Sequence, residues 1–260
     1  FKPLGGIFRN GLKRFSHFYV QNLETKALLA TIGIEDATVT GDTRYDHVLN
    51  QQRHAIAQPS NNSALAKLQA HCIGKTVLIL GSSWLVEEEM VHAIHHKIPL
   101  DLTVIAPHDI SEDHLYEIEA MFGDQCIRLS EIEKITDETV ILVDCIGLLH
   151  QLYQLANIAF IGGGFTGKLH NILEPAAYGI PVVFGPKHSK FPEANEFIEK
   201  GLAYEVNTPQ ELLDKIHLLL RNHSMLKKKI IGFVHEKSGA TTKITQDLSN
   251  KLAHSDFPSN

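Results

Sequence analysis

The chain alternates short apolar runs with longer stretches in which apolar residues recur every three or four positions. The short runs predict strands at residues 76–80, 100–105, 126–129, 140–143, 158–161, 182–184 and 203–206. The amphipathic stretches between them predict helices at residues 86–96, 112–122, 148–156, 172–178 and 193–200. Strands that alternate with helices indicate right-handed βαβ crossovers, so the fold class is predicted to be α/β with a mostly parallel, Rossmann-like sheet.

The segments on either side of this alternation also carry patterns of strands, helices and loops. Residues 17–21 and 37–41 are expected to be strands flanking a helix at 23–32, and the polar run 58–63 is expected to be a surface loop. At the other end, three closing helices are predicted at 209–222, 224–236 and 240–252. No internal repeat is visible.

The stretch 161–191 has the outline of a nucleotide-sugar site. A strand runs into Gly162, Gly163 and Gly164, and after a polar loop His170 and Asn171 are expected to open a helix that carries Glu174. Glycines allow a ligand close to the backbone, and a helix N-terminus offers N–H groups to a phosphate. A glycine-rich loop can equally be a tight turn. The ligand interpretation gains weight because several other loops also follow predicted strands, and ligands bind at the carboxyl ends of parallel strands. These loops contain Gly81-Ser82, Ala106-Pro107-His108 and Gly185-Pro186.

Composition is that of a globular protein. A chain of 260 residues with 43% apolar content can bury a full core, and it contains neither a membrane-length apolar run nor a signal peptide pattern. The net charge of −6 argues against a general nucleic-acid surface, although a local basic patch remains open. The three cysteines lack metal-pair spacing and predict free thiols in a reducing compartment.

Three further groups of residues have simple structural explanations beside functional ones. His92, His95 and His96 could seat a metal, but a solvated histidine-rich face is favoured because no carboxylate or cysteine accompanies them. The lysines at 227–229 are favoured as exposed helix surface. The glutamates at 87–89 suit the dipole of a helix start, with no function required.

Several motifs together resemble the Kdo transferases, the lipopolysaccharide enzymes that move 3-deoxy-D-manno-octulosonic acid (Kdo) from its CMP ester onto a lipid A precursor. The resemblance rests on several motifs in the family's order, and it covers nearly the whole chain. They are Tyr19 to Asn22, Val39 to Asp46, Gly81 to Trp84 with Glu87-Glu88, Ala106 to His108, Gly162-Gly163, His170 to Ala177, Pro181-Val182 and Gly185-Pro186.

Two positions depart from the family pattern. Trp84 stands where the family has a histidine, which puts the role of that imidazole in doubt. Ala106 opens a triplet that in the family often reads Pro-Arg-His, so the arginine contact to the nucleotide is missing or supplied elsewhere.

The resemblance implies the C-terminal half of a GT-B glycosyltransferase. Residues 1–41 would end an N-terminal acceptor domain, with 42–46 as the joint, and residues 42–260 would form the CMP-sugar-binding domain. The first domain, with the catalytic base, is expected to lie upstream of Phe1, so no residue of this chain is assigned a catalytic role and the chain alone is expected to be inactive. No metal or other cofactor is implied.

The resemblance also implies roles for individual residues. Asn171, His170 and Lys168 would stabilise the leaving phosphate, and Glu174 would hold the ribose hydroxyls. Ser82 and Ser83 would hold a phosphate or a sugar carboxylate, with Glu87 and Glu88 as supporting residues. The cytosine would be flanked by Pro107, His108 and the turn at Cys145, Ile146 and Gly147. The full set of donor-binding residues is then Ser82, Ser83, Pro107, His108, Ile146, Gly147, Gly162, Gly163, Gly164, Lys168, His170, Asn171 and Glu174.

The expected partners are CMP-Kdo, a lipid A precursor and the N-terminal domain, without nucleic acid. The full-length enzyme would associate with the cytoplasmic face of the bacterial inner membrane, and this fragment would be soluble. Two alternatives remain open: a non-catalytic nucleotide-binding domain, and an epimerase of GT-B fold that uses a UDP-sugar.

Overall fold

The computed structural model describes residues 5–57 and 62–254. Its contacts divide the chain into two compact units, one formed by Phe1–His47 with His235–Asn260 and the other by Val48–Val234. The boundary predicted between Gly41 and Asp42 lies close to the first division. The C-terminal helix, however, groups with the first unit, whereas the sequence prediction assigns it to the second.

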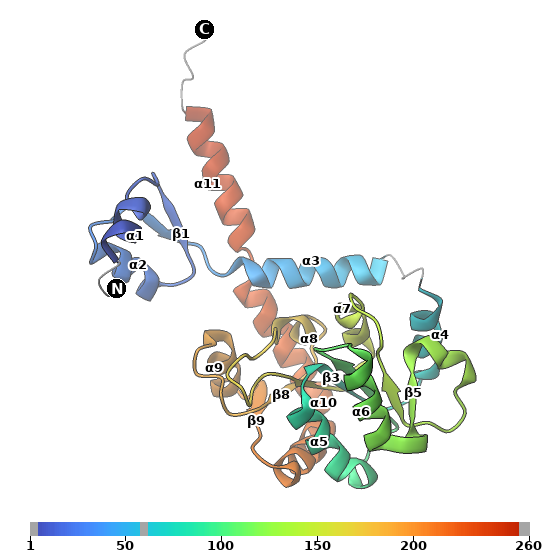
Figure 1. The fold of residues 1–260 in the computed structure, drawn as a ribbon. Helices are drawn as coiled ribbons and strands as arrows, with labels where there is room; N and C mark the ends of the chain where they lie inside the picture. Colours follow the sequence, from blue (N-terminus) through green and yellow to red (C-terminus); the bar gives the residue numbers. More distant parts are fainter. Residues whose placement is uncertain (1–4, 58–61, 255–260) are drawn as a thin grey trace. The chain divides into compact units, whose positions relative to one another are not determined.

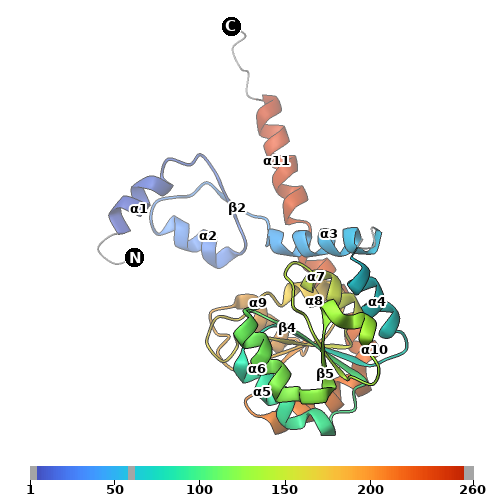
Figure 2. The same cartoon turned by 45° about the vertical axis from the view of Figure 1, so that its right-hand side comes forward.

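The larger unit is built on one parallel sheet of seven strands (Figure 1). The strand order is β5-β6-β4-β3-β7-β8-β9, so the chain leaves β3 toward β4 on one side and later returns to its other side with β7. The strands are β3 (Val77–Ser83), β4 (Leu102–Pro107), β5 (Cys126–Arg128), β6 (Val140–Leu142), β7 (Ile158–Ile161), β8 (Val182–Phe184) and β9 (Ala203–Glu205). The uninterrupted apolar runs are explained by burial on both faces, because helices cover the strands in both views (Figures 1 and 2). All seven predicted strands and the Rossmann-like sheet are confirmed.

The predicted helices between the strands are present with small shifts at their ends. They are α5 (Leu85–Ile94), α6 (Glu112–Phe122), α7 (Leu149–Leu152), α8 (Leu173–Ala177) and α9 (Pro192–Glu199). The prediction of two separate helices at 209–222 and 224–236 is wrong, because α10 (Pro209–Lys237) runs through both. No glycine or proline lies at the expected break, residues 221–225, and the buried side chains Leu219, Leu226 and Ile230 continue one apolar face across it.

Two helices before the sheet were not predicted. The first, α3 (Thr43–Ala57), begins at the expected interdomain joint, and the second is α4 (Ser63–His71). Asn62 caps α4 by accepting a hydrogen bond from Leu65 N at 3.0 Å. The expected surface loop at 58–63 therefore ends in a helix cap, while residues 58–61 lie outside the described part of the chain.

The smaller unit contains a pair of parallel strands, β1 (Phe18–Val20) and β2 (Ala37–Val39), and the helices α1 (Gly5–Leu12), α2 (Leu23–Ala30) and α11 (Ala240–His254). The Asp46 carboxylate joins the N-terminal and C-terminal segments of this unit. It accepts hydrogen bonds from Gly239 N at 2.6 Å and Thr241 N at 2.9 Å. Burial alone would raise the pKa of Asp46, but these N–H donors outweigh it and lower the pKa below its usual range. Tyr19 on β1 also donates to Asp247 on α11 at 2.6 Å.

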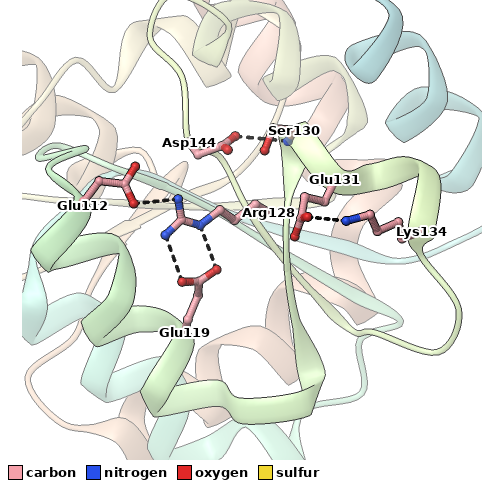
Figure 3. Close-up of polar contacts among 7 residues, drawn as sticks. All are labelled: Glu112, Glu119, Arg128, Ser130, Glu131, Lys134 and Asp144. Atoms are coloured by element: carbon pink, nitrogen blue, oxygen red, sulfur yellow. Dashed lines mark hydrogen bonds and ion pairs between the residues drawn. The ribbon is translucent and has the colours of Figure 1, made fainter.

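A cluster of charged residues lies at the edge of the large sheet formed by β5 (Figure 3). Arg128 forms a paired hydrogen bond to Glu119, at 2.8 and 3.0 Å, and a further one to Glu112 at 2.9 Å. Nearby, Asp144 accepts a hydrogen bond from Ser130 N at 3.2 Å. Because Asp144 directly precedes the turn at residues 145–147, this bond ties that turn to the neighbouring strand end.

Candidate nucleotide-binding site

A cavity of about 170 Å³ opens where β3, β4 and β6 end. Its position is the carboxyl edge of the sheet, where parallel α/β proteins bind ligands. The cavity brings together residues that are far apart in sequence, including five of the predicted donor-binding residues: Ser82, Pro107, His108, Ile146 and Gly147. Apolar side chains, among them Ile110, Val143 and Leu149, form much of the remaining lining.

The two predicted serines lie differently in the turn after β3. Ser82 lines the cavity, whereas Ser83 is fully buried and its hydroxyl donates to Glu88 Oε1 at 2.8 Å. A β-bulge separates them, because the pairing of β3 with β4 shifts register between Gly81 and Ser83. The sequence alone does not distinguish the two hydroxyls, but in the structure only Ser82 lines the cavity.

The three glycines after β7 have a structural explanation in close backbone packing. A Cβ on Gly162 would lie 2.7 Å from the carbonyl carbon of Ser82, and even closer to its oxygen. A Cβ on Gly163, whose φ is +84°, would lie 2.7 Å from the carbonyl carbon of Lys168. A Cβ on Gly164 would lie 2.8 Å from the Cα of Gly185. Protein backbone thus occupies the space beside each glycine, so the approach of a ligand is not needed to explain them.

The loop after these glycines holds the remaining predicted residues. Asn171 does not begin the helix, since the N-cap of α8 is Ile172 and the helix has only five residues. Instead Asn171 Oδ1 accepts from Leu173 N at 3.0 Å, and its Nδ2 donates to Glu174 Oε1 at 3.0 Å. Asn171 and Glu174 therefore form one hydrogen-bonded unit. Lys168 is exposed in the middle of this loop.

Three aromatic rings connect the cavity to this loop. Trp84 stacks on His108 with ring centroids 4.5 Å apart, and His108 lies 4.7 Å from His170. Burial, followed by the nearby imidazole of His108, lowers the pKa of His170, which favours its neutral form. The indole that replaces the family's histidine is thus part of the site's framework.

Two buried carboxylates hold the loops of the site together. Glu87 is 1% exposed and accepts hydrogen bonds from Trp84 N at 3.1 Å and from Gly163 N at 2.9 Å. It therefore joins the turn after β3 to the turn after β7. Glu88, which is fully buried, accepts from Ser83 and lies 3.2 Å from His114 Nε2. Burial raises the pKa of both carboxyls.

The raised pKa values predict how stability depends on pH. A carboxyl whose pKa is higher in the folded state favours folding when protonated, so this contribution is present below about pH 4.3 and is lost as the pH rises through the folded-state value. Glu88→Gln keeps the shape but removes the titration. We expect the parent to lose stability more steeply than the variant as the pH rises above about 4.3, measured by urea unfolding. Equal slopes in the two proteins would contradict this assignment to Glu88.

The histidines at 92, 95 and 96 lie away from the cavity that holds the predicted residues. His95 Nε2 is 3.0 Å from Thr139 Oγ1, and His92 packs edge-on against Phe122. The described residues contain no group of three or more His, Cys, Asp or Glu side chains that could hold a metal ion. Within the same residues, no helix combines the length and apolar character needed to cross a bilayer.

A parallel sheet with this strand order is a Rossmann-like α/β fold, and its cavity lies at the carboxyl edge where such folds bind ligands. No family model matches the chain. The 3-deoxy-D-manno-octulosonic acid transferase of Aquifex aeolicus is 38% identical over 138 residues, which are 52% of this chain and 36% of the relative. The transferase of the same name from Rickettsia bellii is 27% identical over 232 residues, covering 84% of this chain and 52% of the relative.

Solved structures agree on the fold. The C-terminal CMP-Kdo binding domain of WaaA from Acinetobacter baumannii superposes with a TM-score of 0.56 at 22% identity, covering 74% of this chain and 97% of that domain. A trehalose-6-phosphate synthase, OtsA, gives a TM-score of 0.52 at 10% identity over 95% of this chain and 62% of the other. The chain is thus a relative of the Kdo transferases, and its fold is like that of the C-terminal CMP-Kdo binding domain of WaaA. It spans about half or less of the length of these curated relatives.

Proposed function

We propose that the chain forms the donor-binding part of an enzyme that transfers Kdo from CMP-Kdo to a lipid A precursor at the cytoplasmic face of the inner membrane. The observation that carries the proposal is the cavity at the carboxyl edge, which gathers Ser82, Pro107, His108, Ile146 and Gly147 from three different loops. The similarity to Kdo transferases over most of the chain supports the choice of donor.

The leaving group in this reaction is CMP, so negative charge develops on its phosphate. In the proposal, His170, Asn171 and the exposed Lys168 face that phosphate, and hydrogen-bond donors stabilise charge where it develops. Glu174 accepts hydrogen bonds from the ribose hydroxyls. Because Asn171 already donates to Glu174, ligand binding must exchange or share that 3.0 Å bond.

The base that deprotonates the acceptor hydroxyl is proposed to come from the N-terminal part of the full enzyme. We therefore expect no Kdo transfer by this chain alone. Two other assignments, a non-catalytic nucleotide-binding domain and an epimerase acting on a UDP-sugar, differ from the proposal in activity or in the nucleotide bound.

Isothermal titration with CMP, UMP, UDP and AMP tests the choice of nucleotide. We expect CMP to bind most tightly, because the predicted cytosine-flanking residues line the cavity. A preference for UDP would contradict the donor assignment and favour the epimerase.

The same ligands can be located with Cys145, an exposed cysteine that lines the cavity. Burial of the thiol, then the charge of Asp144, raises its pKa, so alkylation should be run at about pH 9 or above to generate thiolate. We expect CMP to protect Cys145. Cys72 and Cys126 are internal controls, because burial raises their pKa values to about 11 and about 12 and keeps them unreactive. Binding without protection would place the nucleotide elsewhere.

A further inference from the structure

Ser82 has an unusual backbone conformation. Its φ of +51° makes it the one residue other than glycine with positive φ in the described part of the chain. A side chain disfavours this left-handed region, which glycine adopts without steric cost. Ser82 is also the bulged residue between β3 and β4, and bulges next to functional sites often redirect a side chain.

The surrounding structure holds Ser82 in this conformation. Its carbonyl is pressed against Gly162, and the next two residues are fixed by hydrogen bonds. Ser83 O accepts from His108 N at 2.9 Å, and Trp84 N donates to Glu87 Oε2 at 3.1 Å. A glycine at position 82 would adopt the same backbone without strain. The serine is therefore expected to be present because its hydroxyl has a role.

The cavity that Ser82 lines is too small for a whole nucleotide sugar. Pockets for drug-sized ligands measure about 300–1,000 Å³, whereas this one has a volume of about 170 Å³. A single planar ring held against Pro107 and apolar side chains suits this space. The polar side chains in the lining belong to Ser82, His108 and Cys145, and the His108 ring is already packed between those of Trp84 and His170.

We propose that the Ser82 hydroxyl hydrogen-bonds the edge of the pyrimidine base and so contributes to the binding of the nucleoside part of the ligand. This role differs from a contact to the phosphate or the sugar carboxylate. It rests on the proposed function, because it requires a nucleotide in this cavity. The strained backbone is then the means by which the hydroxyl reaches the base.

Two substitutions separate the hydroxyl from the strain. Ser82→Gly removes both, so its melting temperature should rise by about 2–4 °C, while CMP affinity should fall roughly three- to tenfold for one neutral hydrogen bond. Ser82→Ala removes only the hydroxyl, so affinity should fall equally without a gain in melting temperature. In both variants cytidine affinity should fall by the same factor as CMP affinity. Ser224→Ala, an exposed serine in α10, is the control and should change neither affinity.

Titrations with CMP, UMP, cytidine and uridine decide the outcome. Equal losses for CMP and UMP with cytidine unaffected would assign Ser82 to the phosphate and overturn the inference. Unchanged CMP affinity in the more stable Ser82→Gly would overturn it as well. If the parent prefers UMP but Ser82→Ala weakens UMP and uridine by the same factor, the inference holds while the proposed donor falls. If the parent binds no nucleotide, both fall together.

Discussion

Replacing Gly162 with alanine is expected to unfold the larger unit or to cost at least about 3 kcal/mol of stability, the upper range for overpacking a core. The new Cβ would lie 2.7 Å from the carbonyl carbon of Ser82 and 2.8 Å from the Cα of Ser83. These are backbone atoms, so rotation of a side chain cannot relieve the clash. The backbone cannot easily shift either, because Gly162 N donates to Gly81 O at 3.0 Å and the strands before both glycines are paired.

Gly232→Ala is the matched control for this prediction. Gly232 lies within α10, and a Cβ there would meet no atom within 4 Å. Alanine should therefore stabilise the helix by about 0.5–1 kcal/mol. Thermal and urea unfolding of both variants measure the difference in sign. A Gly162→Ala protein as stable as the parent would show that the two strand ends are less closely packed than described.

Glu87→Ala is expected to cost about 3 kcal/mol, because a buried acceptor of two backbone N–H groups is lost and both donors are left without a partner. The turns after β3 and β7 lose their common anchor, so nucleotide affinity should fall together with stability. Glu87→Gln should have a smaller effect, since its amide oxygen can still accept a hydrogen bond. Urea unfolding and CMP titration measure the two effects.

The neighbouring glutamate provides a control within the same helix. Glu89 is exposed, and Glu89→Ala should change stability by no more than about 0.5 kcal/mol. The comparison also tests the simpler explanation in which the glutamates at 87–89 act only on the helix dipole. Equal losses in Glu87→Ala and Glu89→Ala would favour that explanation over the anchoring role.

The strands were predictable because a parallel sheet buried on both faces leaves an uninterrupted apolar run, as in Ile158–Ile161. The continuity of helix α10 was harder to predict, because the polar residues around His223 weaken the apolar periodicity without breaking the helix. Helices α3 and α4 were missed for a related reason. In α3, residues 50–54 are all polar, and periodicity alone does not separate such a segment from a loop.

The candidate site was predictable at the level of loops but not of individual side chains. The carboxyl ends of the strands had to meet at one edge, so Pro107 and Ile146 could be placed together from sequence. The opposite orientations of Ser82 and Ser83 depend on a bulge for which the sequence carries no clear signal. The anchoring role of Glu87 depends on a partner 76 residues away, Gly163, which only the folded chain brings near.

The hydrogen bonds from Gly239 and Thr241 to Asp46 affect the order in which the two units can assemble during synthesis. Asp46 and Gly239 are 193 residues apart, and the smaller unit takes its parts from both ends of the chain. The larger unit, Val48–Val234, is continuous in sequence, so it can complete its sheet while α11 is still being translated. The Asp46 carboxylate can accept from Gly239 and Thr241 only after these residues have been translated. A chain whose synthesis is arrested within α11 would therefore contain the whole sequence of the larger unit but lack part of the smaller one.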